Sequence, residues 1–436
     1  MMKRIYILII IGLFSGDLFS QSLKSGPMLG YNTMREVGVW LQLENQGYVS
    51  INYWPEGNEI EVQESETFYS ENYKANTATI SLTNLEPGST YNYKVIVDGL
   101  DSPTADIYSF TTQALWQWRE DPPEFSFIAG SCVYINEAKY DRPGTPYGKD
   151  LSIFTSMANE KDAKFMVWLG DNNYLRDVDF QSRSGIYHRY THSRAVEELQ
   201  PLLAKMHHYA IWDDHDYGPN NSDRTYGHKD KTREAFEDFW ANPNYGVMGL
   251  EGITGNFTWN DCEFFLMDNR WYRTPQSAEG SILGDKQLTW LIDALRTSNA
   301  SIKFICIGGQ VVNDFVGHEN YAVFGAERKK ILHLIDDNNI KNVVFLTGDR
   351  HHSEVSVYNT PDGDKIYDIT SSPITSGAYD HSDEPNSLRF KKDAIIGENN
   401  YAVLEVSGKR TKRKLKVVFK DVKGKKIKEY MIIDNE

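Results

Sequence analysis

Between about residues 22 and 112, apolar and polar positions alternate with a period of two. The alternating runs are short and rich in Val, Ile, Thr and Tyr, for example EVGVWLQLE, YVSINYWPE and TYNYKVIVDG. Stretches that favour turns, such as NQG and EPGS, separate these runs, and no helical period interrupts them. Strands at this spacing predict an all-β sandwich over residues 22–113.

The pattern changes after residue 123, where short apolar runs alternate with segments of helical period. Strand-like runs include FSFIAG, KFMVWLG, KFICIGG and NVVFLTGD, and helix-like runs include DKQLTWLIDALRTS and AERKKILHLIDDN. Asp285 stands where the first of these two helices is expected to be capped. Such alternation predicts an α/β domain over residues 124–436, in which helices cover the layers of sheet.

Residues 114–123, between the two regions, are interpreted as a linker. They include Trp116 and Trp118 and end in two prolines, which prevent regular structure. Since exposed tryptophans on a free linker are costly, we expect the pair to pack against the following domain.

The N-terminus has the layout of a secretory signal peptide. Lys3 and Arg4 precede an apolar run over residues 5–14, and small residues follow near Ser20. This run is shorter than the roughly 20 residues that a membrane span needs, so a membrane anchor is the weaker interpretation. We therefore predict a signal peptide over residues 1–20, a periplasmic or secreted protein, and no transmembrane segment after cleavage.

Composition narrows the class of protein. The chain has 436 residues, 40% of them hydrophobic, and its net charge is −15. This charge argues against specific nucleic-acid binding, because such proteins carry a basic face. The chain has three cysteines, so at least one thiol cannot pair within the chain and needs another explanation.

Chemically active side chains gather where four apolar runs end, in AGSCVY, LGDNNY, IWDDHDYGPNN and LTGDRHHSE. In α/β proteins, binding sites form at the carboxyl ends of strands, so we expect these ends to meet. The candidate residues that follow them are Cys132, Asp171, Tyr174, Asp214, His215, Asp349 and His351. Together they predict a metal site.

Each candidate has a structural alternative. Cys132 is compatible with a small buried hydrophobe, and Asp171 with the cap of a turn. The three aspartates around His215 are compatible with a hydrated loop, but they repel one another unless a cation offsets their charge. The combination therefore favours a metal site over the separate structural roles.

The types of ligand suggest the metals. A phenol has a pKa near 10 and a thiol near 8.5, so binding both as anions requires a strongly Lewis-acidic ion, and phenolate is a known ligand of iron. The remaining carboxylates suit hard divalent ions. We predict Fe³⁺ together with Ca²⁺, or another hard divalent ion such as Mg²⁺ or Mn²⁺. A dizinc site would normally contain more histidine.

Over residues 125–380 the chain resembles the PhoD-like phosphatases and phosphodiesterases of the calcineurin-like metallophosphoesterase superfamily. The motifs that carry this resemblance occur in the order of the family and are GSC, GDNNY, WDDHD, MDNRWYR, LGDKQLTWL, GDRHHS and ITSSPIT. The resemblance implies two central sheets flanked by helices, preceded by a β-sandwich. In the sandwich, LEPGSTYNYKV resembles a corner of fibronectin type III domains.

The resemblance also implies roles for the candidate residues. Cys132, Asp171 and Tyr174 look like ligands of the ferric ion, with Asp171 bridging to the second ion. Asp214 takes the place of a metal-ligating asparagine, and His215 that of the acid and phosphate contact. Asp349 and His351 match the closing metal-binding motif. The family more often has Glu where Asp216 stands, and Gln310 is the best candidate for a polar group that faces the site between Asp216 and Asp349.

The implied reaction is in-line hydrolysis of a phosphate ester by a metal-activated hydroxide. His215 and Asp214 are the predicted catalytic residues, and the acidic neighbours of His215 predict a raised pKa for its imidazole. Arg270 and Arg350 are predicted to hold phosphate oxygens, with structural ion pairs as the alternative.

We therefore predict an exported alkaline phosphatase or phosphodiesterase that acts on small phosphomonoesters, phosphodiesters or both. The alternatives are a phospholipase D-type phosphodiesterase of the same fold and a non-catalytic surface-binding protein that works through its sandwich. A serine hydrolase is disfavoured, because the chain contains no G-x-S-x-G motif.

Overall fold

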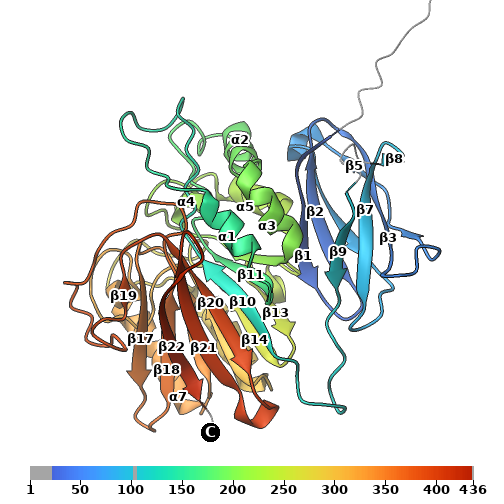
Figure 1. Ribbon diagram of the computed structural model, residues 1–436. Coiled ribbons are helices and arrows are strands. Elements are labelled where there is room, and N and C mark those ends of the chain that lie inside the picture. Colours follow the sequence, from blue (N-terminus) through green and yellow to red (C-terminus); the bar gives the residue numbers. More distant parts are fainter. Residues whose placement is uncertain (1–21, 102–105, 435–436) are drawn as a thin grey trace, which may run out of the picture.

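The computed structural model describes residues 22–101 and 106–434, so the predicted signal peptide lies outside the described residues. An all-β sandwich is followed by an α/β domain with two large sheets and flanking helices, as predicted (Figure 1). Within the described ranges, no helix is both long and apolar enough to cross a membrane.

The sandwich has two layers that enclose an apolar core. Its inward-facing residues include Val39, Ile51 and Tyr93, all of them buried. The strands of the first layer are β1 (Leu23–Asn32), β2 (Val37–Leu43) and β6 (Thr77–Leu82). The strands of the second layer are β3 (Gly47–Pro55), β4 (Gln63–Glu64), β5 (Phe68–Ser70), β7 (Thr90–Val97), β8 (Leu100–Asp101) and β9 (Tyr108–Thr111).

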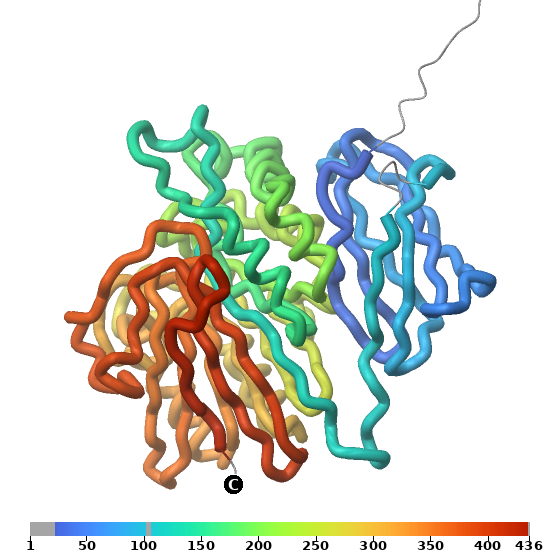
Figure 2. The backbone as a smooth tube through the Cα atoms, in the orientation of Figure 1, coloured from blue at the N-terminus to red at the C-terminus, as the bar shows by residue number. Residues whose placement is uncertain are grey.

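The first large sheet has nine strands, in the order β22-β21-β20-β10-β11-β12-β1-β2-β6. Its centre is parallel and consists of β10 (Phe125–Gly130), β11 (Ala163–Leu169) and β12 (His207–Ile211). One edge is the antiparallel C-terminal part, β20 (Asn400–Ser407), β21 (Lys414–Asp421) and β22 (Lys426–Asp434). In Figure 2 these C-terminal strands lie beside the much earlier strand β10.

The other edge of this sheet is the first layer of the sandwich, which the hydrophobic pattern alone did not indicate. Strand β1 pairs in parallel with β12, where Leu29 lies opposite His207. The His207 ring strengthens the junction, since Nδ1 lies 2.8 Å from the carbonyl oxygen of Gly30 and Nε2 lies 2.8 Å from Nδ2 of Asn32. The two predicted domains therefore share one continuous sheet.

The second large sheet has seven strands and packs face to face on the first. Aromatic rings fill the space between them: Phe127 on β10 contacts Phe264 and Phe304 edge-on, with ring centroids 5.3 Å apart in each pair. The strands are β13 (Gly255–Trp259), β14 (Cys262–Leu266), β15 (Ile302–Cys306), β16 (Val343–Thr347), β18 (Lys365–Thr370), β17 (Ser353–Asn359) and β19 (Ile395–Ile396).

Helices cover the outer faces of both sheets (Figure 1). The first set is α1 (Ser152–Ala158), α2 (Arg183–Arg194), α3 (Gln200–Lys205), α4 (Asp214–Tyr217) and α5 (Lys229–Phe239). On the seven-stranded sheet lie α6 (Gly284–Thr297) and α7 (Gly325–Asp337). The prediction that Asp285 caps α6 is wrong: the Glu327 carboxylate instead accepts hydrogen bonds from the backbone N–H groups of residues 282–284.

The two tryptophans of the predicted linker behave differently. Trp116 is buried, and the Arg410 guanidinium lies 5.6 Å from the centroid of its ring. Trp118 is 100% exposed, so the expectation that it packs against the following domain is wrong. Trp118 also has a positive φ of 63°, which turns the chain there.

Candidate metal centre

The predicted ligands meet at one rim of the α/β domain because the strands that precede them end there. Cys132 and Asp171 follow the adjacent parallel strands β10 and β11, and Asp349 follows β16 of the facing sheet. The backbone is left-handed at Cys132 (φ 61°), Asp171 (φ 51°), Asp349 (φ 65°) and His351 (φ 55°). This conformation is unfavourable for residues other than glycine and is often found at functional sites.

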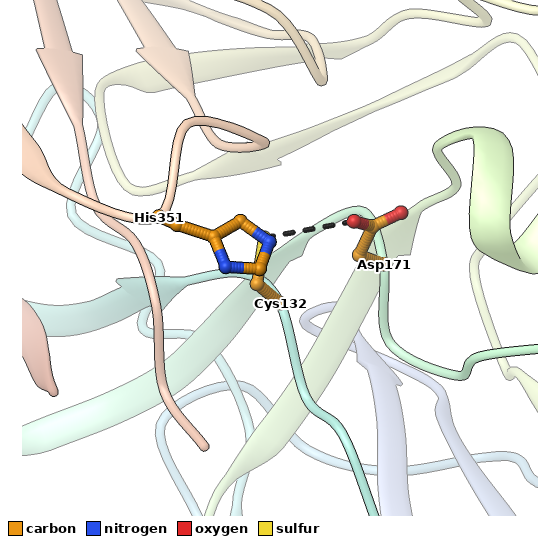
Figure 3. A group of neighbouring side chains, drawn as sticks. All are labelled: Cys132, Asp171 and His351. Carbon is orange, nitrogen blue, oxygen red and sulfur yellow. Dashed lines mark hydrogen bonds between the residues drawn. The ribbon is translucent and has the colours of Figure 1, made fainter. Parts of the chain in front are cut away.

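Cys132, Asp171 and His351 point toward one another from three separate segments (Figure 3). Their ligand atoms lie within 4.8 Å of one another, and the Cys132 thiol donates to Oδ2 of Asp171 at 3.6 Å. The Tyr174 hydroxyl donates to the same Oδ2 at 3.1 Å and lies 3.4 Å from Nε2 of His351. The structure thus brings together thiol, phenol, imidazole and carboxyl groups in the combination that the sequence predicted.

Two further groups continue the cluster. One contains Asp171, Asp214 and His215, and the other contains Asp213, Asp214 and Asp349, again with all ligand atoms within 4.8 Å. Asp171 and Asp214 each belong to two groups, so neighbouring cations here would share carboxylates. Asp213 was not among the predicted ligands, although it adjoins Asp214 in the WDDHD motif.

The atoms that lack partners fit a bound cation. Among the described residues, Oδ2 of Asp213, Oδ1 of Asp214 and Nδ1 of His215 are buried without a hydrogen-bond partner. Unsatisfied buried acceptors are costly, and a cation among them would complete their coordination. The donor set of oxygen, nitrogen and sulfur atoms is suitable for metal ions.

Burial dominates the electrostatics of the cluster. Burial, together with the nearby Asp349 carboxylate, raises the pKa of the Cys132 thiol to about 12. Burial, with the charges of Asp213, Glu319 and Asp214, raises the pKa of Asp349 to about 8. A cation reverses this effect because it favours the charged forms. Without a cation the structure therefore disfavours the Cys132 thiolate and the Asp349 carboxylate. Asp214 differs: although burial opposes the shift, His215 and Arg270 lower the pKa of its carboxyl group.

His215 differs from the sequence-based expectation. Its backbone N–H donates to Oδ1 of Asp171 at 3.3 Å, and its ring stacks on the Tyr174 ring at 4.3 Å between centroids. The expectation of a raised pKa is wrong: burial lowers the pKa of His215, although Asp214 opposes the shift. Desolvation outweighs the neighbouring carboxylate because the ring lies against protein on most sides.

Six residues of the cluster, but not Cys132 or Asp213, line an open cavity of about 620 Å³, a size typical of small-molecule sites. Asp171, Asp214 and Asp349 lie at the floor with Tyr174, His215 and His351. The walls are mostly polar and aromatic and include Tyr134, Asn136, Asp141, Arg142, Tyr147, Arg176, Asn220, Asn221 and Tyr379.

The structure does not place Arg270 and Arg350 where the sequence analysis predicted. Neither residue lines the cavity. Arg270 is 1% exposed and donates from Nε to Asp213 at 2.6 Å and from Nη2 to Glu319 at 2.9 Å. Arg350 is buried and donates to Glu384 at 2.5 Å. Carboxylates therefore occupy both guanidinium groups, which is the structural alternative.

Gln310 and Asp216 also have structural partners. The Gln310 amide donates to Glu354 at 2.8 Å, and this residue does not line the cavity. Asp216 is fully buried and accepts hydrogen bonds from the backbone N–H groups of Asp213 at 3.0 Å and Asn172 at 3.2 Å. Asp216 thereby fixes the two loops that carry the predicted ligands.

The fold is that of a metallophosphoesterase. The solved structure of the purple acid phosphatase PPD1 from yellow lupin seeds matches with a TM-score of 0.68 at 11% identity, covering 93% of this chain and 74% of that one. A structure of PhoD matches with a TM-score of 0.72 at 16% identity, covering 94% of this chain and 92% of that one.

Within this class, the chain belongs to the PhoD-like phosphatase family, whose sequence profile matches residues 131–415. A second profile, a domain of unknown function (DUF7800), matches residues 20–113. Alkaline phosphatase D of Bacillus subtilis (strain 168) is 22% identical over 382 residues. That match covers 74% of this chain and 62% of the relative, so the chain spans less than two thirds of the relative's length.

Proposed function

We propose that this protein is an exported, metal-dependent hydrolase of small phosphomonoesters, phosphodiesters or both. The observation that carries the proposal is the set of three overlapping ligand groups on the floor of an open cavity. The name of the relative, alkaline phosphatase D, supports phosphate-ester hydrolysis. Export rests on the N-terminal pattern of basic, apolar and small residues.

We assign the ligand roles by donor type. Cys132, Tyr174 and His351 would hold Fe³⁺ with Asp171, and Asp214 with Asp349 would hold Ca²⁺ or another hard divalent ion. The unpartnered oxygen of Asp213 suits the same second ion. When bound, such ions supply Lewis acidity to phosphoryl oxygens and to water.

The chain itself would supply the proton for the leaving group. Hydrolysis breaks the bond between phosphorus and the ester oxygen, and that oxygen needs a proton when its parent alcohol is a weak acid. His215 lies at the floor of the cavity beside Asp171 and Asp214, where it would protonate this oxygen.

Removal of metal tests the proposed reaction. Protein purified with its native ions is expected to hydrolyse p-nitrophenyl phosphate, bis(p-nitrophenyl) phosphate or both, and chelation followed by dialysis should reduce turnover to background. Adding back Fe³⁺ with Ca²⁺, Mg²⁺ or Mn²⁺ should restore it, with elemental analysis of each sample as the control. Turnover that survives complete loss of metal, or no turnover by the native protein, contradicts the proposal.

The assignment of ferric iron makes a separate, spectroscopic prediction. Burial raises the pKa of Tyr174 well above its ordinary value, so a phenolate here depends on a bound cation. Phenolate bound to Fe³⁺ absorbs visible light, so the native protein should be coloured, and Tyr174→Phe should bleach or shift the band. Tyr147→Phe is the matched control, since Tyr147 also contacts His351, at 3.1 Å, without belonging to the predicted ligand set. A colourless, fully active protein without iron favours two divalent ions instead.

A further inference from the structure

Arg176 differs from the buried arginines around the metal centre. Its side chain is partly exposed and lines the cavity only two positions after Tyr174. The buried arginines Arg189, Arg270 and Arg350 each form an ion pair with a carboxylate. Within residues 22–101 and 106–434, the Arg176 guanidinium forms no ion pair, and its side chain lines the cavity.

Two carboxylates, one bonded to the Arg176 backbone and one on the same cavity wall, have other hydrogen-bond partners. Asp179 accepts from the backbone N–H of Arg176 at 2.9 Å and from Nε of Arg189 at 2.8 Å. Asp141 accepts from the Tyr134 hydroxyl at 2.9 Å and from the backbone N–H of Glu137 at 2.6 Å. These contacts leave the Arg176 guanidinium available to a ligand.

Aromatic rings place Arg176 beside the predicted proton donor. Its guanidinium lies 5.8 Å from the centroid of the Tyr134 ring, the Tyr134 and Tyr174 centroids are 4.9 Å apart, and the Tyr174 and His215 centroids are 4.3 Å apart. Arg176 is therefore on the side of the cavity that would receive the leaving group.

A second arginine reaches the same cavity from the segment 136–149. Asn136 and Gly148 exchange hydrogen bonds of 3.0 Å at the base of this segment, which hold its two ends together. Arg142 lies within it, exposed and on the cavity wall. A cavity of about 620 Å³ is much larger than one phosphoryl group needs, so a substrate can reach the floor and both arginines.

We propose that Arg176, assisted by Arg142, forms an anion subsite for a second negative charge on the leaving-group part of the substrate. This inference rests on the proposed function and names the class of substrate: phosphate esters whose alcohol carries a carboxylate or another phosphate. Guanidinium groups bind both anions through paired hydrogen bonds. The cations at the floor bind the phosphoryl group that is cleaved, and Arg176 binds the charge beyond it.

Two substrates of similar size test this subsite. Hydrolysis of glycerol 3-phosphate releases glycerol, a neutral alcohol. Hydrolysis of 3-phosphoglycerate releases glycerate, an alcohol that carries a carboxylate. In the native metalloprotein, Arg176→Gln is expected to lower kcat/KM for 3-phosphoglycerate about ten- to hundredfold more than for glycerol 3-phosphate, as expected for the loss of a charge-assisted hydrogen bond. Arg142→Gln should act in the same direction with a smaller effect, because Arg142 is exposed to solvent.

The controls separate this role from a structural one. Arg176→Lys keeps the charge and should recover part of the preference for 3-phosphoglycerate. Arg296→Gln removes an exposed arginine on α6, outside the cavity, and should leave both substrates unaffected. Equal loss on both substrates in Arg176→Gln, or no loss on either, overturns the subsite.

A different set of results would contradict the proposed function itself. If the wild-type protein hydrolyses neither these two monoesters nor the nitrophenyl mono- and diesters, the proposed function is overturned, and 3-phosphoglycerate then serves as a simple ligand. Calorimetry on the same metalloprotein should still find that Arg176→Gln weakens binding of 3-phosphoglycerate at least about tenfold more than binding of glycerol 3-phosphate. Equal weakening of the two overturns the subsite as well.

Discussion

Replacement of Asp171 by Asn is expected to lower kcat/KM for any phosphate ester roughly 10³-fold, because metal ions supply several kcal/mol of charge stabilisation in such reactions. Asp171 belongs to two of the three ligand groups, so its change affects both predicted ion positions. An amide of the same shape keeps the packing but removes the negative charge. Steady-state kinetics with metal analysis of the same sample measures the effect.

Stability distinguishes loss of metal from loss of fold in this variant. Burial and the neighbouring charges of Asp214 and Cys132 raise the pKa of Asp171 well above its ordinary value, so its charged form is unfavourable without a cation. The metal-free Asp171→Asn protein should therefore melt no lower than metal-free wild type. Asp177→Asn, an exposed change a few residues along the same loop, is the matched control and should keep full activity. Full metal content and turnover in Asp171→Asn remove Asp171 from the site.

His215→Ala is expected to slow hydrolysis of alkyl phosphate esters about 10²–10⁴-fold and that of nitrophenyl esters much less. The difference arises because an alkoxide needs a proton to leave, whereas nitrophenolate does not. Comparison of kcat/KM for the two classes of ester on one preparation measures it. His333→Ala, an exposed change on α7, should leave both rates unchanged.

Two other outcomes for His215→Ala have distinct meanings. An equal loss on both classes of ester, with metal content unchanged, indicates that His215 positions the phosphate and does not donate a proton. Loss of metal indicates that it is a ligand, as its grouping with Asp171 and Asp214 allows.

Much of the candidate site could be predicted because it depends on local patterns. The ends of the apolar runs that form β10, β11 and β16 can be recognised in the sequence, and residues such as Cys132 and Asp171 follow within two positions. The carboxyl ends of neighbouring parallel strands must meet, so the proximity of Cys132 and Asp171 follows from general topology. The approach of Asp349, which follows β16 of the facing sheet, depends on how the two sheets pack.

The errors concern the choice of partners, which depends on the folded structure. Arg270 lies 57 positions from Asp213, and no local pattern indicates that this carboxylate occupies its guanidinium. Arg176 was not predicted as a site residue. Only the folded structure reveals that its side chain lines the cavity and that the nearby carboxylates have other partners. The sequence pattern of strand β1 likewise carries no information about its pairing with β12.

Because β1 pairs with β12, the sandwich satisfies backbone groups at what would otherwise be an open edge of the sheet. Without β1, the strand β12 would become the last strand of its sheet, with unpaired backbone groups beside a hydrophobic layer. Such an edge invites pairing with another polypeptide, so the α/β region cut free at the linker would tend to associate with itself. Any related catalytic region that functions without an N-terminal sandwich must protect this strand by another means, such as a helix, a charged edge or a second subunit.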